Sequence, residues 1–590
     1  MPPDPPTQKS SHGHDNRGLS AGADPSVAFG RYGQMFDKLA PATELPPGAL
    51  WDLAQAMIKV DAGSPINGED NADENPTIPA GYTYFGQFVD HDLTFDPTPF
   101  NASERDLNAL MDFRSPALDL DNVYGRGPDD QPYMYTKDGL HLIVGTQPGN
   151  EGAQVGTKAD LFRITAGDRA DVPVLGDKRN DENKIVSQIH GALIAFHNKV
   201  VDDNDLITQF GGDLADATSR FKAAAQIVRW HYQWVVVFDY LDRITEPGMV
   251  NEVLNPGDTP RLSHYIKSDA PHPYMPVEFA GAAFRFGHSM VRPSYALNKV
   301  IGANTEPSPG EKEANRIATF TRDSDPAKNL NGFPGPLPPG WGIDWGFFFS
   351  GLPTATLEQE NTGPKSEKGF RVPQPSYRID ALLVSPLHDL PDFFKTTDPS
   401  DLTAVIGAEK IVPQEKAPPP QTLVGHLAFR NLLRGQKLGL PSGQAVSNAL
   451  NITPLSDDVL WQAGSRLLNP KGLNKKDRAD WETTTARRQA VLKAWGGQGL
   501  AKNTPLWYYI LREAEYYGVT NDLNEDLVGM GGQHLGPVGS RIVAETLIGV
   551  LWVDETSFLH DKRGFKPLPQ IVGEDGGDFT IAKLLRYALT

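Results

Sequence analysis

The chain is 590 residues long and 39% hydrophobic, enough to bury a sizeable core, and its 57 glycines and 50 prolines predict many ordered loops. Acidic residues outnumber basic ones by 74 to 55, so the net charge of −19 disfavours a nucleic-acid partner or an anionic membrane surface. The absence of cysteine excludes disulfides, thiolate metal ligands and cysteine nucleophiles. No run of 18 apolar residues occurs, so no membrane-spanning helix is predicted.

The first segment, from Met1 to Asp24, is polar and rich in Pro, Ser, Gly and His. Such a composition buries too little apolar surface to fold, so we expect residues 1–24 to form a disordered arm. The segment has no hydrophobic stretch of the kind found in signal peptides, which leaves a cytoplasmic location or export by a non-classical route. No linker or repeat divides the rest of the chain, so residues 25–590 are predicted to form one domain.

Residues 86–92 read Gly-Gln-Phe-Val-Asp-His-Asp. If they are helical, Gln87 and His91 lie on one face because they are four residues apart. Asp90 and Asp92 then point about 100° to either side of His91. A base, an amide and a carboxylate could meet at one ligand while the second carboxylate points elsewhere. The alternative is a solvated acidic surface patch that contains a histidine.

The next pattern lies in the stretch from Arg114 to Gly125. Oxygen atoms are available at alternate positions, from the side chains of Ser115, Asp119 and Asp121 and from the carbonyl of Ala117. Calcium takes roughly six to eight oxygen ligands, so this spacing could surround a calcium ion. An ordinary Asx-rich turn is the alternative.

Two further patterns come later in the chain. Arg179 and Glu182 are three residues apart just before an expected helix start at Lys184, so both side chains could face one site. A surface charge cluster that caps the helix is the alternative. His288 ends the apolar sequence Phe-Arg-Phe-Gly-His, where a lone histidine is more often a satisfied core residue than a ligand.

Apolar periodicity predicts five long helices, at residues 184–203, 220–243, 422–437, 505–517 and 538–553, the last beginning near Pro537. His190 and His197 lie seven residues apart on the first of these helices and are predicted to be packed structural histidines. Strand signals are few, and the Pro- and Gly-rich stretches 302–342 and 395–421 predict long surface loops. The expected fold is therefore mostly α, a single large helical domain with long loops and little β.

Together and in this order, the motifs resemble the peroxidase–cyclooxygenase superfamily of haem proteins, whose animal members include myeloperoxidase and peroxidasin. The resemblance extends from about Phe29 to Leu551 and includes residues 81–94, 179–190, 284–288 and 535–545. The lack of cysteine and the sequence Arg-Asn-Asp-Glu-Asn at residues 179–183 look closer to bacterial members than to the disulfide-rich animal enzymes. The resemblance implies an animal-type haem-peroxidase domain.

The resemblance also implies roles for individual residues. His91 matches the distal histidine that takes a proton from hydrogen peroxide, Arg179 the arginine that stabilises the developing oxyanion, and Gln87 the glutamine that holds water or a halide. His288 matches the proximal ligand of the haem iron. These roles imply a peroxidase that forms an oxyferryl intermediate and oxidises small phenolic or aromatic donors, halides or thiocyanate, an activity suited to oxidative stress.

Haem b and calcium are the cofactors implied. Asp90 and Glu182 match the carboxylates that animal peroxidases esterify to haem methyl groups, so two covalent links are available. Asn183 stands where myeloperoxidase alone uses a methionine, so that third link is expected to be absent. The family calcium site is matched by Asp92, Ser115, Ala117, Asp119 and Asp121, of which Asp121 replaces a more usual hydroxyl residue.

In the family, an amide side chain accepts a hydrogen bond from the second imidazole N–H of the proximal histidine. Aligning the segment from Asn431 onwards with the family's Gly-Leu-Pro segment places Gln444 in that role, where asparagine is usual. Arg285 and Arg434 are candidate partners of the haem propionates, with structural salt bridges as the alternative.

Three rival functions differ from this expectation in the residues they need. Fatty-acid dioxygenases of the same superfamily resemble cyclooxygenase in carrying a radical-forming tyrosine three residues before the proximal histidine, and that position is Arg285 here. A haem- and calcium-containing binding protein without turnover would need neither the base His91 nor the cation Arg179. A non-haem metal enzyme is disfavoured because no compact ligand triad stands out. The sequence does not select the electron donor or the oligomeric state.

Overall fold

The structure, a computed structural model, describes residues 30–59, 73–95, 111–150, 152–266, 273–301, 316–321, 323, 325, 327–332, 335–353, 373–391, 425–519, 531–573 and 576–590. The predicted arm at residues 1–24 and the predicted loop at 395–421 lie outside these residues, as do residues 302–315 of the other predicted loop. Over the described part the fold is mostly helical with little strand, as expected.

The longer helices are α1 (Pro47–Ala56), α2 (Gly81–Leu93), α4 (Lys184–Asp202), α6 (Ala217–Val235), α12 (Leu427–Lys437), α15 (Lys475–Trp495), α16 (Leu506–Tyr517), α17 (Pro537–Val553) and α19 (Ile581–Leu589). The shorter ones are α3 (Asp121–Tyr124), α5 (Asn204–Gln209), α7 (Asp242–Ile244), α8 (Met249–Leu254), α9 (Val277–Gly281), α13 (Gly443–Ala449), α14 (Asp457–Leu460) and α18 (Pro569–Val572). A π-helical turn, η6 (Val236–Leu241), joins α6 to α7. The 3-10 helices are η4 (Pro132–Met134), η5 (Lys178–Asp181), η7 (Ala283–Met290), η8 (Trp345–Phe347), η9 (Ser385–His388), η11 (Pro470–Gly472), η12 (Gly496–Gln498) and η13 (Phe558–His560).

Strands are short and form three small sheets in the described residues. Strand β1 (Gly30–Gly33) pairs antiparallel with β3 (Met111–Asp112) and parallel with β4 (Met275–Pro276). Strand β2 (Glu74–Pro79) pairs with β7 (Pro375–Tyr377), and β5 (Ser294–Tyr295) pairs with β6 (Ile317–Ala318), both antiparallel. These pairings tie distant segments together without forming a layer of their own.

Local chemistry explains where the predicted helices begin. The side chain of Asn183 accepts a hydrogen bond from the Ile185 amide at 2.8 Å and caps α4, and Pro537 occupies the first turn of α17. The long helix α15 was not predicted. Only Thr484, Thr485, Arg488 and Val491 are buried along its length, so it lacks the apolar stripe by which helices are recognised in a sequence.

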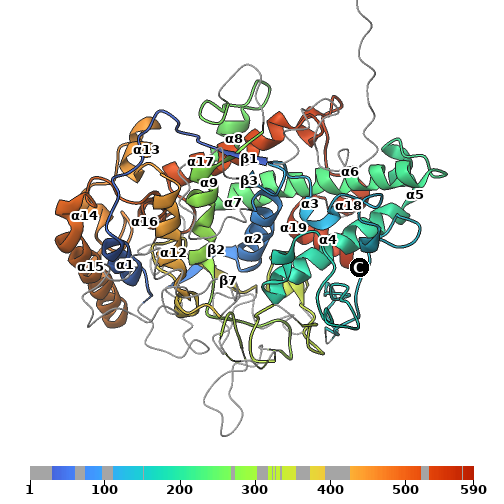
Figure 1. The fold of residues 1–590 in the computed structure, drawn as a ribbon, viewed down its shortest axis with the longest axis horizontal. Coiled ribbons are helices and arrows are strands. Elements are labelled where there is room, and N and C mark those ends of the chain that lie inside the picture. Colours follow the sequence, from blue (N-terminus) through green and yellow to red (C-terminus); the bar gives the residue numbers. More distant parts are fainter. Residues whose placement is uncertain are drawn as a thin grey trace, which may run out of the picture.

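Helix α2 lies near the middle of the molecule (Figure 1). Helices α1 and α12–α16 gather on one side of it in this view, and α3–α6, α18 and α19 on the other. It packs against α4, η5, η6 and η7. Gly86 permits one of these approaches, because a Cβ atom there would collide with the hydroxyl of Tyr240 on η6. The polar heptapeptide at residues 86–92 therefore lies in the centre of the fold.

Among the described residues, no helix combines the length and the apolar character needed to cross a membrane.

The buried histidine His231 on α6 is predicted to make folding stability depend on pH. Its Nδ1 lies 2.7 Å from the Ile227 carbonyl and its Nε2 accepts from the Leu568 amide at 3.0 Å, so the ring must be neutral to keep both bonds. Burial lowers the pKa of His231 to about 4. Between pH 6.5 and about 4, the imidazole of His231 binds a proton in the unfolded chain but not in the folded one. The free energy of unfolding therefore falls as the pH drops through this range, by roughly 1.4 kcal/mol per pH unit for this group. Urea unfolding across this range should show a shallower pH dependence for His231→Leu than for the wild type, and equal slopes would contradict the prediction.

Candidate functional site

Helix α2 presents its polar residues in different directions, as the spacing predicted. Along Gly81–Leu93 every residue is buried except Gln87 and Asp90. His91 is only 3% exposed and Asp92 is fully buried. The interpretation of residues 86–92 as a solvated surface patch is therefore wrong. These polar side chains need partners inside the fold.

His91 meets a carboxylate and an amide at its two ring nitrogens. Its Nε2 lies 3.6 Å from Oε1 of Glu182, the same oxygen to which Gln87 donates from one turn earlier on α2. Its Nδ1 lies 2.8 Å from Oδ1 of Asn180 on η5. Burial, with a smaller effect from Arg179, lowers the pKa of His91 to about 3, so the ring is neutral and able to accept a proton. Burial raises the pKa of Glu182 to about 7.

Arg179 lies at the C-terminal end of α2 rather than beside the His91 ring. Its Nη2 donates to the carbonyls of His91, at 3.2 Å, and Thr94. Asp177 accepts hydrogen bonds from Nη2 at 2.8 Å and from Nε at 3.1 Å. The guanidinium lies 4.7 Å from the centre of the Phe95 ring. These contacts fix the cation in place. Within the described residues they leave Nη1 without a hydrogen-bond partner, and it is this atom that could meet an oxyanion.

Asp90 belongs to a second face of α2. Thr94 donates to its Oδ1 at 3.1 Å, and burial raises the pKa of the carboxyl, opposed by the nearby charges of Arg179 and Arg285. Arg285 belongs to η7, the segment that carries His288, so its charge acts on Asp90 from a second element. Asp90 and Glu182 are both partly exposed, and the side chain of Glu182 is 31% accessible.

The proximal candidate His288 lies on η7 and is held by one amide. Nδ2 of Asn431, on α12, lies 2.9 Å from Nδ1 of His288, and Oδ1 of the same amide accepts from Arg285 at 2.8 Å. The ring of Trp507 stands edge-on, 6.4 Å away. Burial, then Arg285, lowers the pKa of His288 to about 3. The imidazole is therefore neutral, and in the described part of the chain its Nε2 has no hydrogen-bond partner.

The prediction for Gln444 is wrong. Its side chain donates to the Ala501 carbonyl at 3.0 Å and to Oγ1 of Thr504 at 2.8 Å, and accepts from the Thr504 amide at 3.1 Å. It lies on α13, after the turn at residues 439–441, whereas the amide that reaches His288 comes from Asn431 before that turn. Arg285 is bound to Asn431 and, at 2.8 Å, to the Ala280 carbonyl, and its role toward a haem propionate stays a prediction.

A matched pair of variants separates these two amides. Asn431→Ala should release the His288 ring and leave Arg285 without its acceptor, because both bonds run through one side chain. We expect a shifted iron coordination spectrum and metal-site affinity or activity lower by roughly 10- to 100-fold. Gln444→Ala should leave the spectrum unchanged and act only on thermal stability. A changed spectrum in Gln444→Ala alone would contradict the assignment.

The predicted calcium ligands come together. One oxygen from each of Asp92, Asp119 and Asp121 lies within 4.8 Å of the others, and all three residues are buried. Burial raises the pKa of each carboxyl, and repulsion within the cluster raises the pKa of Asp92 and Asp119 further, whereas Arg114 opposes the rise at Asp121. Oδ1 of Asp92 is buried without a hydrogen-bond partner among the described residues. Three adjacent buried carboxylates with an orphaned oxygen form a donor set that fits a hard cation.

The loop that supplies these carboxylates is held around them. Ser115 donates to Asp119 at 2.8 Å, and the Leu120 amide donates to Oδ2 of Asp92 at 3.2 Å. Leu120 adopts a φ of 59°, which turns the chain sharply between Asp119 and Asp121. Ala117 is buried in the same loop. The loop is thereby tied to α2 one residue from His91.

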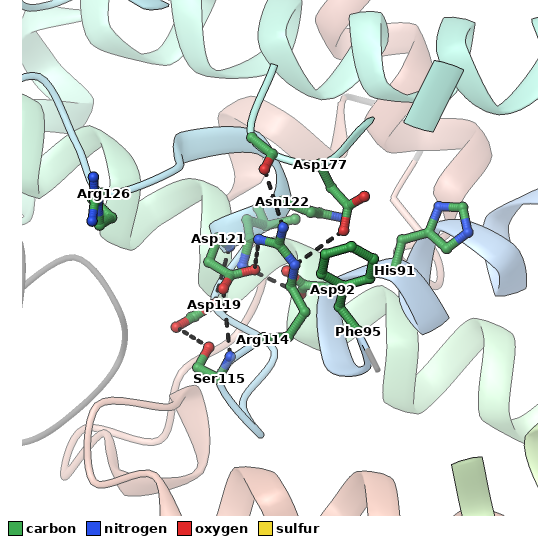
Figure 2. Close-up of polar contacts among 12 residues, drawn as sticks. His91, Asp92, Phe95, Arg114, Ser115, Asp119, Asp121, Asn122, Arg126 and Asp177 are labelled. Atoms are coloured by element: carbon green, nitrogen blue, oxygen red, sulfur yellow. Dashed lines mark hydrogen bonds and ion pairs between the residues drawn. The ribbon is translucent and has the colours of Figure 1, made fainter. Parts of the chain in front are cut away.

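Arg114 links the carboxylate cluster to the Arg179 segment (Figure 2). Its Nη1 bonds Oδ1 of Asp121 at 3.1 Å, and its Nε lies 3.0 Å from Oδ2 of Asp177. Asp177 also holds Arg179, and these two arginines keep the pKa of the Asp177 carboxyl well below its usual range despite burial. One chain of ion pairs therefore joins the candidate cation site to Arg179.

Sequence reasoning missed Asn180, Asp177, Arg114 and Asn431 as site residues. Asp177 and Asn180 flank Arg179 and could have been suspected from that position alone. Asn431 begins the segment whose alignment assigned the amide role to Gln444 instead. Nothing in the local sequence signals that Arg114 bridges two acids from different segments.

Residues 101–329 match the family model of the animal haem peroxidases. That span, which is less than half of the chain, includes Arg179, Glu182, His288 and the loop of Asp119 and Asp121, while α2 precedes it. The match agrees with the resemblance seen in the motifs, and residues 101–329 are similar to the animal haem peroxidases.

Among solved structures, peroxidase A from Dictyostelium discoideum is similar, with a TM-score of 0.49, 12% identity and coverage of 95% of this chain and 93% of that one. A fatty acid alpha-dioxygenase from Oryza sativa gives a TM-score of 0.44 and 13% identity, covering 91% of this chain and 76% of that one. The corresponding enzyme from Arabidopsis thaliana gives 0.45 and 11%, covering 93% and 74%. These distant similarities support no argument about activity. A search among curated proteins finds no match.

Proposed function

We propose that the protein is a haem peroxidase that reduces hydrogen peroxide and oxidises small phenolic or aromatic donors, halides or thiocyanate. The observation that carries this proposal is the state of His91, a buried neutral base whose Nδ1 is engaged by Asn180. A packed core histidine would not need a carboxylate and an amide at its two ring nitrogens. The family match adds haem as the expected cofactor.

Ligation of a haem iron by Nε2 of the neutral His288 ring needs the lone pair on Nε2 and the proton on Nδ1. Nδ2 of Asn431 faces Nδ1 in the structure, so ligation requires the amide to turn and present its oxygen to the Nδ1 proton, which ends the bond that Arg285 makes to that oxygen. His288 would ligate the iron, and Asp90 and Glu182 would lie toward the haem edge. Bound haem supplies the redox chemistry that breaks the O–O bond. We also propose that Asp90 and Glu182 form ester bonds to haem methyl groups. Acid–acetone extraction that removes all the haem would refute these bonds.

On the distal side, the proposed work of the chain is proton transfer and charge stabilisation. Nε2 of His91 takes the proton from one peroxide oxygen and delivers it to the other, which leaves as water. Nη1 of Arg179 faces the negative charge that develops as the oxygens separate. The hydrogen bond from Gln87 to Glu182 holds the Gln87 amide in place, and this amide orients peroxide or water beside His91. Calcium bound by Asp92, Asp119 and Asp121 would hold α2, and with it His91, in position.

The purified protein is expected to show a Soret band and to oxidise a phenolic dye with peroxide. Rates with phenol, bromide, iodide and thiocyanate, compared at one peroxide concentration, identify the preferred donor. Failure to take up haem on reconstitution would refute the proposal. Oxygen uptake with a fatty acid, without peroxide turnover, would instead favour a dioxygenase, which Arg285 three residues before His288 disfavours.

A further inference from the structure

We propose that Asn180 and His190 form a hydrogen-bond relay that holds His91 in the one tautomer able to act as a base at Nε2. Both would be positioning residues, acting through His91 without touching the substrate. The inference rests on the proposed function in one respect, the role of His91 as the base. It also changes the interpretation of His190, which the sequence predicted to be a packed structural histidine.

The first bond of the relay fixes the proton on His91. Oδ1 of Asn180 lies 2.8 Å from Nδ1 of His91, and a carbonyl oxygen can only accept. Nδ1 of His91 must therefore carry the proton, and Nε2 must carry the lone pair. Nε2 is the nitrogen that faces Glu182 at 3.6 Å, on the side of α2 where Gln87 also lies. The opposite tautomer would place a donor where the proposed reaction needs an acceptor.

The second bond engages the nitrogen end of the same amide. Nδ2 of Asn180 lies 2.9 Å from Nδ1 of His190, so the amide donates to His190 while its oxygen faces His91. An amide rotated by half a turn would present N–H groups to His91 and reverse its tautomer. His190 can accept only while it is neutral, and burial lowers its pKa to about 4. The ring therefore stays an acceptor through the neutral pH range.

A histidine is less favourable at position 190 than an apolar residue of similar volume. It is completely buried on α4, and among the described residues its Nε2, which must carry the proton, has no hydrogen-bond partner. Leaving a buried polar group unsatisfied costs about 1–3 kcal/mol, which an apolar side chain of similar volume would avoid. Within the described part of the chain, the bond to Asn180 is thus the polar contact that explains a histidine at this position.

His197, two turns further along α4, provides the contrast. It is equally buried, but its Nδ1 meets the hydroxyl of Tyr124 at 3.1 Å and its Nε2 meets the Leu140 carbonyl at 2.9 Å. Both of its nitrogens are satisfied away from α2. His197 is the satisfied packing histidine that the sequence predicted for both positions, and it serves as a matched control.

The relay also joins three elements around one point. Asn180 lies on η5, His190 on α4 and His91 on α2, and these elements pack against one another. The ring of Phe88, on α2, packs edge-to-face with the His190 ring, with 6.3 Å between the ring centroids. Asn180 itself is completely buried, so water does not compete for its amide. The geometry therefore couples the tautomer of the base to the packing of α4.

The test combines nitrogen NMR with kinetics on the full-length holoprotein. In the diamagnetic ferrous carbon monoxide form with ¹⁵N-labelled histidine, the His91 signals, assigned by their loss in His91→Ala, should show a protonated Nδ1 and an unprotonated Nε2. Asn180→Leu should mix the tautomers and slow the reaction with peroxide by at least roughly tenfold. His190→Leu should act in the same direction. His190→Gln, whose amide oxygen can accept from Asn180, should restore both readouts, and His197→Leu should leave them unchanged.

A proton on Nε2 of His91 in the wild type would overturn the proposal, as would wild-type tautomer and rate in Asn180→Leu. Equal effects from His190→Gln and His190→Leu would reduce His190 to a packing residue and also overturn it. Failure of the proposed function is a separate result: a wild type that binds no haem or does not react with peroxide. In that case the NMR measurement on the haem-free full chain still decides whether Asn180 sets the His91 tautomer.

Discussion

Replacing His91 by alanine is expected to slow the reaction of the haem-loaded protein with peroxide by roughly 10²- to 10⁴-fold. The variant loses the neutral base that the structure places beside Gln87, Glu182 and the Arg179 segment. Haem should still bind, because the proposed iron ligand His288 lies on η7 and contacts Asn431 instead of His91. Stopped-flow absorbance under pseudo-first-order peroxide gives the rate, and the Soret band gives the haem content.

The control for this prediction is His197→Ala, which removes a buried histidine of the same kind from outside the site. It should lower thermal stability without changing the rate with peroxide by more than about twofold. His288→Ala should alter the iron coordination spectrum, which His91→Ala should leave largely intact. A rate in His91→Ala within about threefold of the wild type, with haem bound, would remove His91 from the mechanism.

The second large effect is expected at the carboxylate cluster. Asp92→Asn should abolish the response of the protein to calcium and its chelators. In the wild type, a bound cation would offset the repulsion among Asp92, Asp119 and Asp121, whose oxygens lie within 4.8 Å of one another in a buried space. At a calcium concentration near 1,000 times its dissociation constant, binding stabilises the fold by about 4 kcal/mol, and chelation removes that amount. Thermal unfolding with calcium and with a chelator measures both effects.

A matched control is available in Asp112, which is also fully buried with an unpartnered Oδ2 among the described residues but lies outside the cluster. Asp112→Asn should keep the full calcium response. Calcium removal should also slow the reaction with peroxide, because Arg114 connects Asp121 to Asp177 and so to Arg179. An unchanged unfolding temperature on chelation of the wild type would contradict the cation site.

Much of the fold was predictable where the signal is local. The starts of α4 and α17 follow from Asn183 and Pro537, and the apolar periodicity located α6 and α16. Helix α15 was missed because its neighbours bury only a narrow part of it, and no periodic stripe remains in the sequence.

The heptapeptide of residues 86–92 separates what each level determines. The sequence by itself determined that Gln87 and His91 share a face and that Asp90 and Asp92 diverge from it, because helical spacing is a property of consecutive residues. Only the tertiary structure decided which partners those faces meet. Asn180 reaches His91, Asn431 replaces Gln444 at His288, and Arg114 joins two acids, because each contact depends on how separate helices and turns pack. Spacing along one helix is set by its backbone, whereas contact between helices is set by the path of the chain around them.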